Sequence, residues 1–231
     1  MAPANAPRSQ THRTRIVVVD DHPIVRRGLR DLICREPDLE VCGEAGDAIE
    51  AARLVQAADP DLVLVDLSLP AGHGIELIRQ LRLSGSRAKM LVVSMHDESL
   101  FAERVLRAGA MGYVNKQEAD AVLLGAIREV LAGRIYLSHT LSGRVLHNIL
   151  YGPSVDEDPI QALSNRELQV FEMIGQGLAA KNIAVKLQLS RKTVEAHREK
   201  IKAKLNLGSS TELGWRAIQW VLEGPSGKDS P

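Results

Sequence analysis

The chain has 231 residues, of which 45% are hydrophobic and 25% charged, enough apolar material for the core of one large domain or two small ones. Its two cysteines lack metal-ligand spacing, which argues against a zinc site or a disulfide framework and favours a reducing, cytoplasmic setting. No apolar run of the sequence approaches the length of a membrane span, so we expect no membrane contact. Residues 1–14 lack the apolar core of a signal peptide and are expected to form a flexible tail.

The net charge of zero hides a difference between two parts of the chain. Residues 15–132 contain 14 basic and 19 acidic residues, a net charge of −5, whereas residues 161–224 contain 10 basic and 6 acidic ones, a net charge of +4. The later part is therefore the candidate for binding a polyanion.

Residues 15–133 alternate short, β-branched apolar runs with amphipathic helical stretches, which is the pattern of a parallel sheet with crossover helices. Each run is apolar along its whole length, as expected for strands that helices cover on both faces. The predicted fold class is therefore α/β, with a doubly wound five-stranded parallel sheet. The strands are expected at 16–19, 39–42, 62–65, 90–93 and 112–114, and the helices at 24–33, 49–57, 75–83, 100–108 and 121–131.

Residues 134–160 are the predicted linker, because Gly152, Pro153 and an acidic run at 156–158 interrupt the pattern, although 141–150 has the pattern of a short helix. Residues 161–224 predict a small all-α four-helix domain, and 225–231 a second flexible tail. Ser164 and Ser209 each precede a glutamate by three positions, which is capping-box spacing, and Ser190 suits an N-cap. The four helices are expected at 166–174, 181–187, 192–204 and 211–222.

The predicted strands of the first domain end in residues that suit phosphoryl chemistry. Functional groups of an open parallel sheet gather at the carboxyl ends of its strands, and these ends carry Asp20, Asp21, Asp66, Ser94 and Lys116. Clustered carboxylates repel one another unless a cation lies among them, and an all-oxygen set suits Mg²⁺. Asp66 alone ends the central strand, so it is the candidate nucleophile, with Lys116 neutralising charge on a transferred phosphoryl group.

Each of these positions has an ordinary structural explanation when taken alone, because an aspartate at a strand end often caps a helix or a turn. The joint occurrence of all five argues for a site. Three histidines near the same strand ends, His22, His73 and His96, are interpreted as solvated or loop residues without a role.

Segment 17–21, Asp66 with Pro70 four positions later, Ser94 and Lys116 together resemble the receiver domain of two-component response regulators. The resemblance implies a flavodoxin-like fold in which a partner sensor histidine kinase phosphorylates Asp66, with Mg²⁺ as the cofactor. Gln117 is a departure, since family members usually carry proline there, and this puts the amplitude of the switch in doubt. The further roles implied are Asp21, Asp66 and the backbone carbonyl of Ser68 as metal ligands, Asp20 acting largely through water, Ser94 as the switch hydroxyl, and Tyr113 as the aromatic that turns inward.

The helices at 181–187 and 192–204, joined by a few residues, have the spacing of a helix-turn-helix. At about 100° per residue, Val194, Ile201 and Leu205 share the core-facing side of the second helix. The opposite side carries small and charged residues that suit a major groove. A solvated basic helix that packs on a small bundle is the alternative explanation.

The residues at 163–168, 181–184, 192–194, 197–198 and 204–205 strongly resemble the LuxR-type helix-turn-helix. Together with the receiver, this pattern is similar to the NarL/FixJ class, whose members regulate transcription by binding double-stranded DNA. The DNA contacts that the resemblance implies are Lys181, Lys192, Thr193, Glu195, Ala196, Arg198, Glu199 and Lys200.

The last predicted helix carries more apolar surface than a helix at the end of a monomer needs. Its apolar side chains either form a dimer contact or close the four-helix core. The resemblance favours a homodimer, through the receiver or this helix, on a palindromic site, with RNA polymerase as a further candidate partner. The side chains are Leu213, Ala217, Ile218, Trp220 and Val221.

Two other functions stay open from the residues alone. A phosphatase or phosphotransferase that turns over through an aspartyl phosphate needs an acid/base group two residues after the nucleophile, where this chain has Ser68. A partner-binding module would use the receiver only to dimerise. The resemblance favours a regulator that is no enzyme beyond phosphoryl transfer to its own Asp66 and slow autodephosphorylation.

Overall fold

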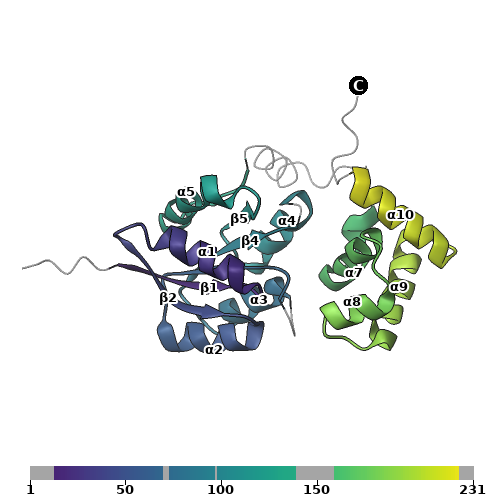
Figure 1. Ribbon diagram of the computed structural model, residues 1–231, viewed down its shortest axis with the longest axis horizontal. Coiled ribbons are helices and arrows are strands. Elements are labelled where there is room, and N and C mark those ends of the chain that lie inside the picture. The colour runs from purple at the N-terminus through teal and green to yellow at the C-terminus, as the bar shows by residue number, and fades with distance from the viewer. Residues whose placement is uncertain (1–12, 70–72, 97, 139–158, 224–231) are drawn as a thin grey trace, which may run out of the picture.

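The computed structural model describes residues 13–69, 73–96, 98–138 and 159–223, in which an α/β unit is followed by a helical unit (Figure 1). The predicted linker helix at 141–150 lies outside the described residues, as do Pro70, residues 1–12 of the predicted N-terminal tail and the whole predicted C-terminal tail. None of the helices within the described residues combines the length and apolarity that crossing a membrane requires.

The α/β unit is built on a five-stranded sheet in the order β2-β1-β3-β4-β5, and every neighbouring pair is parallel. This topology confirms the predicted fold class. It also places β1 and β3 side by side in the middle of the sheet, so residues that follow these strands lie close together. The strands are β1 (Thr14–Val19), β2 (Leu39–Ala45), β3 (Leu62–Val65), β4 (Lys89–Ser94) and β5 (Gly112–Asn115).

The burial of each strand follows its place in the sheet. All four residues of central β3 are buried, as predicted for a strand covered on both faces. Edge strand β2 is longer than its apolar run, because it continues through Gly43 and Glu44 to Ala45, and five of its seven residues are only half-buried. An edge strand pairs on one side only, so polar residues are tolerated there and the apolar run underestimates its length.

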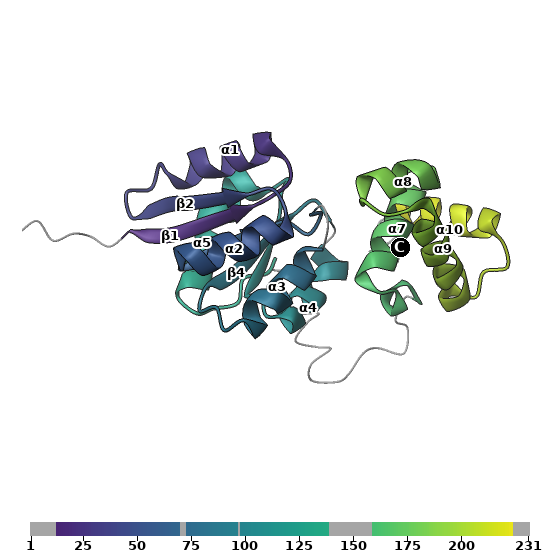
Figure 2. The same ribbon diagram turned by 90° about the horizontal axis from the view of Figure 1, so that it is seen from below.

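Five helices cover the two faces of the sheet (Figures 1 and 2). Alternate residues of β1 point to opposite faces: Ile16 and Val18 belong to one buried cluster, and Val17 and Val19 to the other. Helices α1 (Pro23–Ile33) and α5 (Ala119–Leu131) cover the first face. The second face is covered by α2 (Ala48–Ala58), α3 (Gly74–Leu83) and α4 (Glu98–Ala108).

Helix α3 begins unusually close to the end of β3. A Cβ atom at Gly74 would lie 2.2 Å from the Asp66 carbonyl oxygen, a backbone atom that has no room to move. Glycine is therefore required at this position, and the close approach fixes the first turn of α3 next to Asp66.

The helical unit consists of a 3₁₀ turn and four α-helices around an apolar core. Ser164 and Glu167 form the predicted capping box, and the Ser190 side chain accepts from the Thr193 backbone N–H as an N-cap. At the last helix Ser209 caps as predicted, although the Glu212 carboxylate reaches back to the Gly208 N–H. The elements are η1 (Pro159–Ala162), α7 (Asn165–Gly175), α8 (Ala180–Lys186), α9 (Arg191–Leu205) and α10 (Ser210–Glu223).

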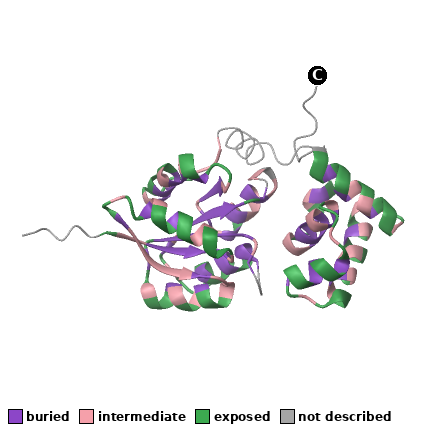
Figure 3. Ribbon diagram, viewed as in Figure 1, coloured by how far each residue is buried: buried purple, intermediate pink, exposed green. Residues whose placement is uncertain are grey.

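Figure 3 shows that buried residues run along the inner sides of these helices, while their outer sides are exposed. Val194 and Ile201 of α9 are fully buried, as predicted, and Trp220 of α10 packs against Phe171 with ring centroids 5.6 Å apart. Leu213, Ala217 and Trp220 close the core, whereas Ile218 and Val221 stay more than one-third exposed. One side of α10 therefore closes the core, which is one of the two uses that the sequence left open, and the other side stays exposed.

Glu167→Gln is expected to destabilise the helical unit by about 1–2 kcal/mol, because the buried Glu167 carboxylate accepts a charged hydrogen bond of 2.7 Å from Lys204 Nζ. Both tryptophans of the chain, Trp215 and Trp220, lie in α10, so tryptophan fluorescence during urea unfolding reports on this unit alone. The exposed Glu199→Gln on α9 is the control and should cost less than about 0.5 kcal/mol.

The same pair predicts a pH dependence. Burial raises the pKa of Glu167, but the bonds from Lys204 and Ser164 outweigh it and the net pKa is lowered. Its contribution to stability is therefore complete above the unfolded pKa of about 4.5 and is lost as the pH falls through the lower folded pKa. An equal loss of stability on acidification in wild type and Glu167→Gln would contradict this assignment.

Candidate phosphoacceptor site and DNA-facing helix

The carboxyl ends of β1, β3 and β5 bring two buried carboxylates and a lysine into direct contact. Asp20 and Asp66 are only 1% and 3% exposed, and Lys116 Nζ lies 2.5 Å from Asp20 Oδ2 and 2.8 Å from Asp66 Oδ2. Burial opposes the charge of Lys116, but the neighbouring carboxylates outweigh it and raise the pKa of the ammonium group. The lysine is therefore charged at neutral pH and neutralises one of the two acids.

The two oxygens of Asp66 differ. Oδ2 accepts from Lys116, whereas Oδ1 is buried and accepts no hydrogen bond from any residue that the structure describes. A buried carboxylate oxygen without a partner is costly, so Oδ1 is the atom of this cluster that has most to gain from a cation or an electrophile.

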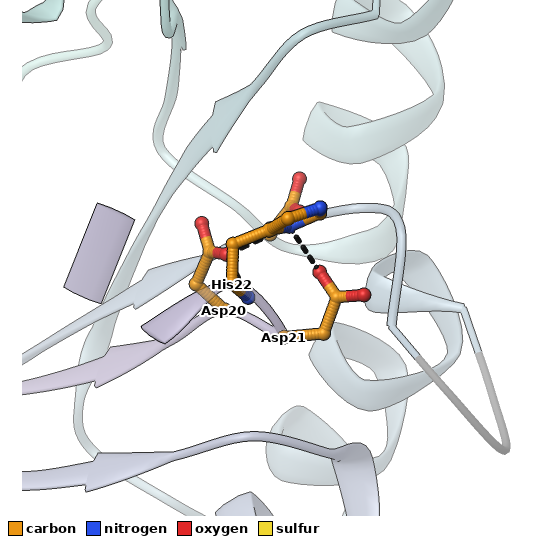
Figure 4. Close-up of side chains that lie close together, drawn as sticks. Asp20, Asp21 and His22 are labelled. Atoms are coloured by element: carbon orange, nitrogen blue, oxygen red, sulfur yellow. Dashed lines mark hydrogen bonds and ion pairs between the residues drawn. The ribbon is translucent and has the colours of Figure 1, made fainter. Parts of the chain in front are cut away.

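Asp21 and His22 complete an acidic group around this oxygen. Ligand atoms of Asp20, Asp21, His22 and Asp66 lie within 4.8 Å of one another. His22 Nδ1 is 2.6 Å from Asp21 Oδ1 and 3.4 Å from Asp20 Oδ1 (Figure 4). Burial and the charges of Asp66 and Asp20 raise the pKa of Asp21 against the opposing charges of His22 and Lys116. Three carboxylates at this spacing fit a hard divalent cation.

Ser94 and Tyr113 lie beside the cluster on β4 and β5. Ser94 is fully buried, and its hydroxyl oxygen accepts weakly from the His96 backbone N–H at 3.4 Å. The Tyr113 ring is 1% exposed, and its hydroxyl donates to the His96 carbonyl at 2.8 Å. Gln117 donates its backbone N–H to Asn115 Oδ1 at 2.9 Å, a bond that the usual proline lacks the hydrogen to make.

His73 and His96 lie in loops, as one part of the interpretation had it, but the solvated part is wrong, since they are 3% and 8% exposed. Nδ1 of His73 accepts from the Ile75 N–H at the start of α3, and burial, helped by nearby cationic groups, lowers the pKa of His73 to about 3. His96 is bonded on both sides: Nε2 is 2.8 Å from Ser68 Oγ, and Nδ1 is 2.7 Å from Glu172 of α7. His22 is solvated, as interpreted, with a side chain that is 63% exposed, and it also pairs with Asp21.

The acceptor cluster opens into a pocket of about 230 Å³ that the helical unit helps to form. Asp66, Ser68 and Lys116 line one side, and Gln169, Glu172 and Lys186 line the other. The sequence patterns identify the first group, since strand ends are local features. They miss the second, because nothing local indicates which helix of one unit faces the other.

The outward side of α9 is exposed, as predicted. Thr193 and Arg198 are partly engaged within the helix, since Thr193 Oγ1 bonds Ser190 Oγ at 2.8 Å and Arg198 lies 3.6 Å from Glu195. The other residues with predicted DNA contacts reach solvent freely: Lys181, Lys192, Ala196, Glu199 and Lys200 are exposed, and the Glu195 side chain is 45% exposed.

Comparison with known proteins decides what this combination is. The response regulator receiver domain matches residues 16–128, and the luxR family of bacterial regulatory proteins matches residues 161–217. The chain belongs to the LuxR-type response regulators. Members of this family are transcription factors rather than enzymes that turn over a substrate, and this response regulator is a two-component transcription regulator with a receiver and a DNA-binding domain.

Relatives match one or both parts of this response regulator. Oxygen regulatory protein NreC of Staphylococcus epidermidis is 37% identical over 214 residues, which cover 90% of this chain and 98% of NreC. A LuxR-family response regulator from Aurantimonas is 43% identical with a TM-score of 0.56, covering 60% of this chain and 99% of that one. RcsB from Salmonella enterica serovar Typhimurium, bound to promoter rprA with the phosphomimetic BeF₃⁻, is 25% identical with a TM-score of 0.61, covering 90% and 99%.

Lys116→Met is expected to destabilise the receiver of this response regulator by about 3 kcal/mol at neutral pH, because it leaves two buried carboxylates without a counter-charge. Adding Asp66→Asn should restore part of the loss by removing one of those charges. Urea unfolding in EDTA, followed by circular dichroism, measures both changes in the free energy of unfolding. Tryptophan fluorescence reports the unfolding of the helical unit, which is subtracted. Lys89→Met, which removes a bond to the neutral Leu131 carbonyl, should cost about 1 kcal/mol. Equal losses for the two lysines would show that the cluster is not electrostatically coupled.

Proposed function

We propose that Asp66 is the phosphoacceptor of this response regulator and that its free Oδ1 is the attacking atom. The observation that carries the proposal is the buried, unpartnered state of Oδ1 beside an oxygen already paired with Lys116. Attack forms a bond between Oδ1 and phosphorus while the bond from phosphorus to the donor breaks, and the donor leaves with that electron pair. Lys116 then lies where negative charge develops on the phosphoryl oxygens.

We propose Mg²⁺ as the cofactor, held by Asp21, Asp66 and the backbone carbonyl of Ser68, with Asp20 acting largely through water. The acidic group around Oδ1 supports this choice, because its carboxylate oxygens are the ligands of a hard cation. When bound, the cation supplies charge neutralisation for the phosphoryl group. Asp20 keeps Lys116 in place at 2.5 Å, and Asp21 contributes a carboxylate that is only partly buried and therefore open to exchange.

The switch proposed here passes from the phosphoryl group to Ser94 and Tyr113. A phosphoryl group adds nearly two negative charges and three acceptor oxygens, which recruit the Ser94 hydroxyl and Lys116. The Ser94 hydroxyl accepts from the His96 backbone N–H, and the Tyr113 hydroxyl donates to the His96 carbonyl. Both side chains are therefore drawn into one rearrangement. Autodephosphorylation is expected to be slow.

The α8–α9 helix-turn-helix is proposed to bind double-stranded DNA through the outward side of α9. Lys181, Lys192, Lys200 and Arg198 contact phosphates, with Thr193 beside them, and Glu195, Ala196 and Glu199 face the bases. Support comes from the exposure of this side and from the net positive charge of residues 161–224.

The proposed division of the chain is a receiver at 15–133, a linker at 134–160 and a DNA-binding domain at 161–224, between tails at 1–14 and 225–231. The proposed partners are a sensor histidine kinase, double-stranded DNA, a second copy of the chain and RNA polymerase, all in the cytoplasm. Exposed Ile218, Val221 and Leu222 on α10 support a homodimer through that helix, and the receiver is the other candidate surface.

Incubation with Mg²⁺ and acetyl phosphate is expected to raise the mass of the chain by one phosphoryl group. Asp66→Asn should reduce labelling to background because it removes the nucleophile, and Asp21→Asn should slow it about tenfold or more because it removes a metal ligand. Intact-protein mass spectrometry measures each rate, with Asp120→Asn, an exposed carboxylate of α5, as the control. Full labelling of Asp66→Asn would overturn the proposal.

DNA affinity is expected to fall steeply with salt, because lysine–phosphate contacts release counterions. Lys192→Ala should lower the slope of log affinity against log salt by about 0.9, the value for one phosphate contact. Lys202→Ala, on the same helix but only 17% exposed and paired with Glu199 at 2.9 Å, should leave the slope unchanged. Fluorescence anisotropy with a labelled duplex measures both. Equal slopes for wild type and Lys192→Ala would place the DNA elsewhere.

A further inference from the structure

Within the described residues, two sets of polar contacts hold the DNA-binding domain against the receiver. Arg104 of α4 donates to the carbonyls of Leu163 and Gln161 at 2.7 and 2.9 Å and to Asn165 Oδ1 at 3.0 Å. His96, in the loop after β4, pairs with Glu172 at 2.7 Å. We call the contacts among these six residues, three of Arg104 and one of His96, the docking contacts. The buried apolar cluster beneath α3 and α4 also continues into the core of the DNA-binding domain.

The geometry of docking covers the phosphoacceptor rather than the DNA-facing helix. Gln169, Glu172 and Lys186 of α7 and α8 line the same pocket as Asp66, and Gln169 is 1% exposed. The outward side of α9 remains exposed in this docked arrangement, at Lys192, Glu199 and Lys200 among others. Docking as seen here therefore restricts access to Asp66 and leaves the DNA-contacting side free.

We propose that the DNA-binding domain covers Asp66, and that the docking contacts of Arg104 and Glu172 slow phosphoryl transfer to it without hiding the DNA-binding surface. The inference rests on phosphorylation of Asp66, proposed above. Docking narrows the route to Oδ1, since α7 and α8 close one side of the pocket of about 230 Å³ into which Asp66 opens. The part of the pocket formed by α7 and α8 carries one carboxylate, Glu172, and one ammonium group, Lys186, so its charge alone does not exclude an anionic phosphodonor.

Charge and docking can be separated, because the two sets of contacts carry opposite charges. Glu172→Gln removes a negative charge beside the pocket, and Arg104→Ala removes a positive charge from α4 that does not line the pocket. If only the local potential matters, the first variant attracts an anionic donor and the second does not. If docking limits access, both variants accelerate phosphorylation.

The test measures the initial rate at which full-length protein gains a phosphoryl group from acetyl phosphate and Mg²⁺, with acetate as the leaving group. Arg104→Ala and Glu172→Gln are each expected to react about five- to tenfold faster than wild type, because the accessible fraction grows as docking weakens. Arg107→Ala is the matched control: it lies one turn along α4, removes the same charge and has a 77% exposed side chain, and its rate should equal that of wild type.

A second readout uses unphosphorylated protein and a fluorescein-labelled duplex of mixed sequence at low salt. Both docking variants should bind it within about twofold of wild type, since α9 is already exposed. Labelling of Asp66 at equal rates in wild type and the three variants would overturn this inference. Acceleration by Glu172→Gln alone, or a rise in DNA affinity without faster labelling, would overturn it as well. Absence of labelling in every protein would overturn the proposed function and this inference together. Unchanged tryptophan fluorescence shows that the helical unit of each variant is folded, and unchanged far-ultraviolet circular dichroism shows the same for the receiver.

Discussion

The structure depends on an electrostatic constraint: two buried carboxylates share a single ammonium group. Asp20 and Asp66 both approach Lys116, so one negative charge is left over in a place where burial makes it expensive. A parallel sheet with β1 beside β3 creates this situation, and the close approach at Gly74 places the start of α3 next to Asp66. The excess charge is the physical basis for the proposed uptake of a cation and a phosphoryl group at Asp66 Oδ1.

Few polar contacts join the two domains in the part of the chain that the structure describes, which suits a reversible interaction. His96 is the central residue, because its ring joins Ser68, two positions after Asp66, to Glu172 of the DNA-binding domain, while its backbone is held by Ser94 and Tyr113. His96 therefore links the residues beside Asp66 to the domain boundary. Arg104 supplies a second attachment away from the pocket, so docking strength and acceptor chemistry can be altered separately.

Much of this arrangement could be predicted from sequence because it follows from local patterns. Asp66 ends a fully apolar run, and the rules of parallel sheets place that end beside Asp20. Ser164 and Ser190 likewise mark helix starts by spacing alone. The burial of His73 and His96 could not be predicted, because it depends on Phe101 and on a helix from the other domain. The apolar pattern also does not predict the full length of β2, since the polar residues of this strand are tolerated only at the edge of a sheet.

Hydrogen exchange followed by mass spectrometry, with and without Mg²⁺ and beryllofluoride, shows whether the switch starts at Asp66. We expect slower exchange at residues 94–96 and 113–116, where Ser94 and Lys116 close on the phosphoryl mimic, and faster exchange along 161–175, where docking is released. Asp66→Asn should abolish both changes. Unaltered exchange at the strand ends, or changes that persist in Asp66→Asn, would show that the acidic cluster around Asp66 is not the centre from which the switch begins.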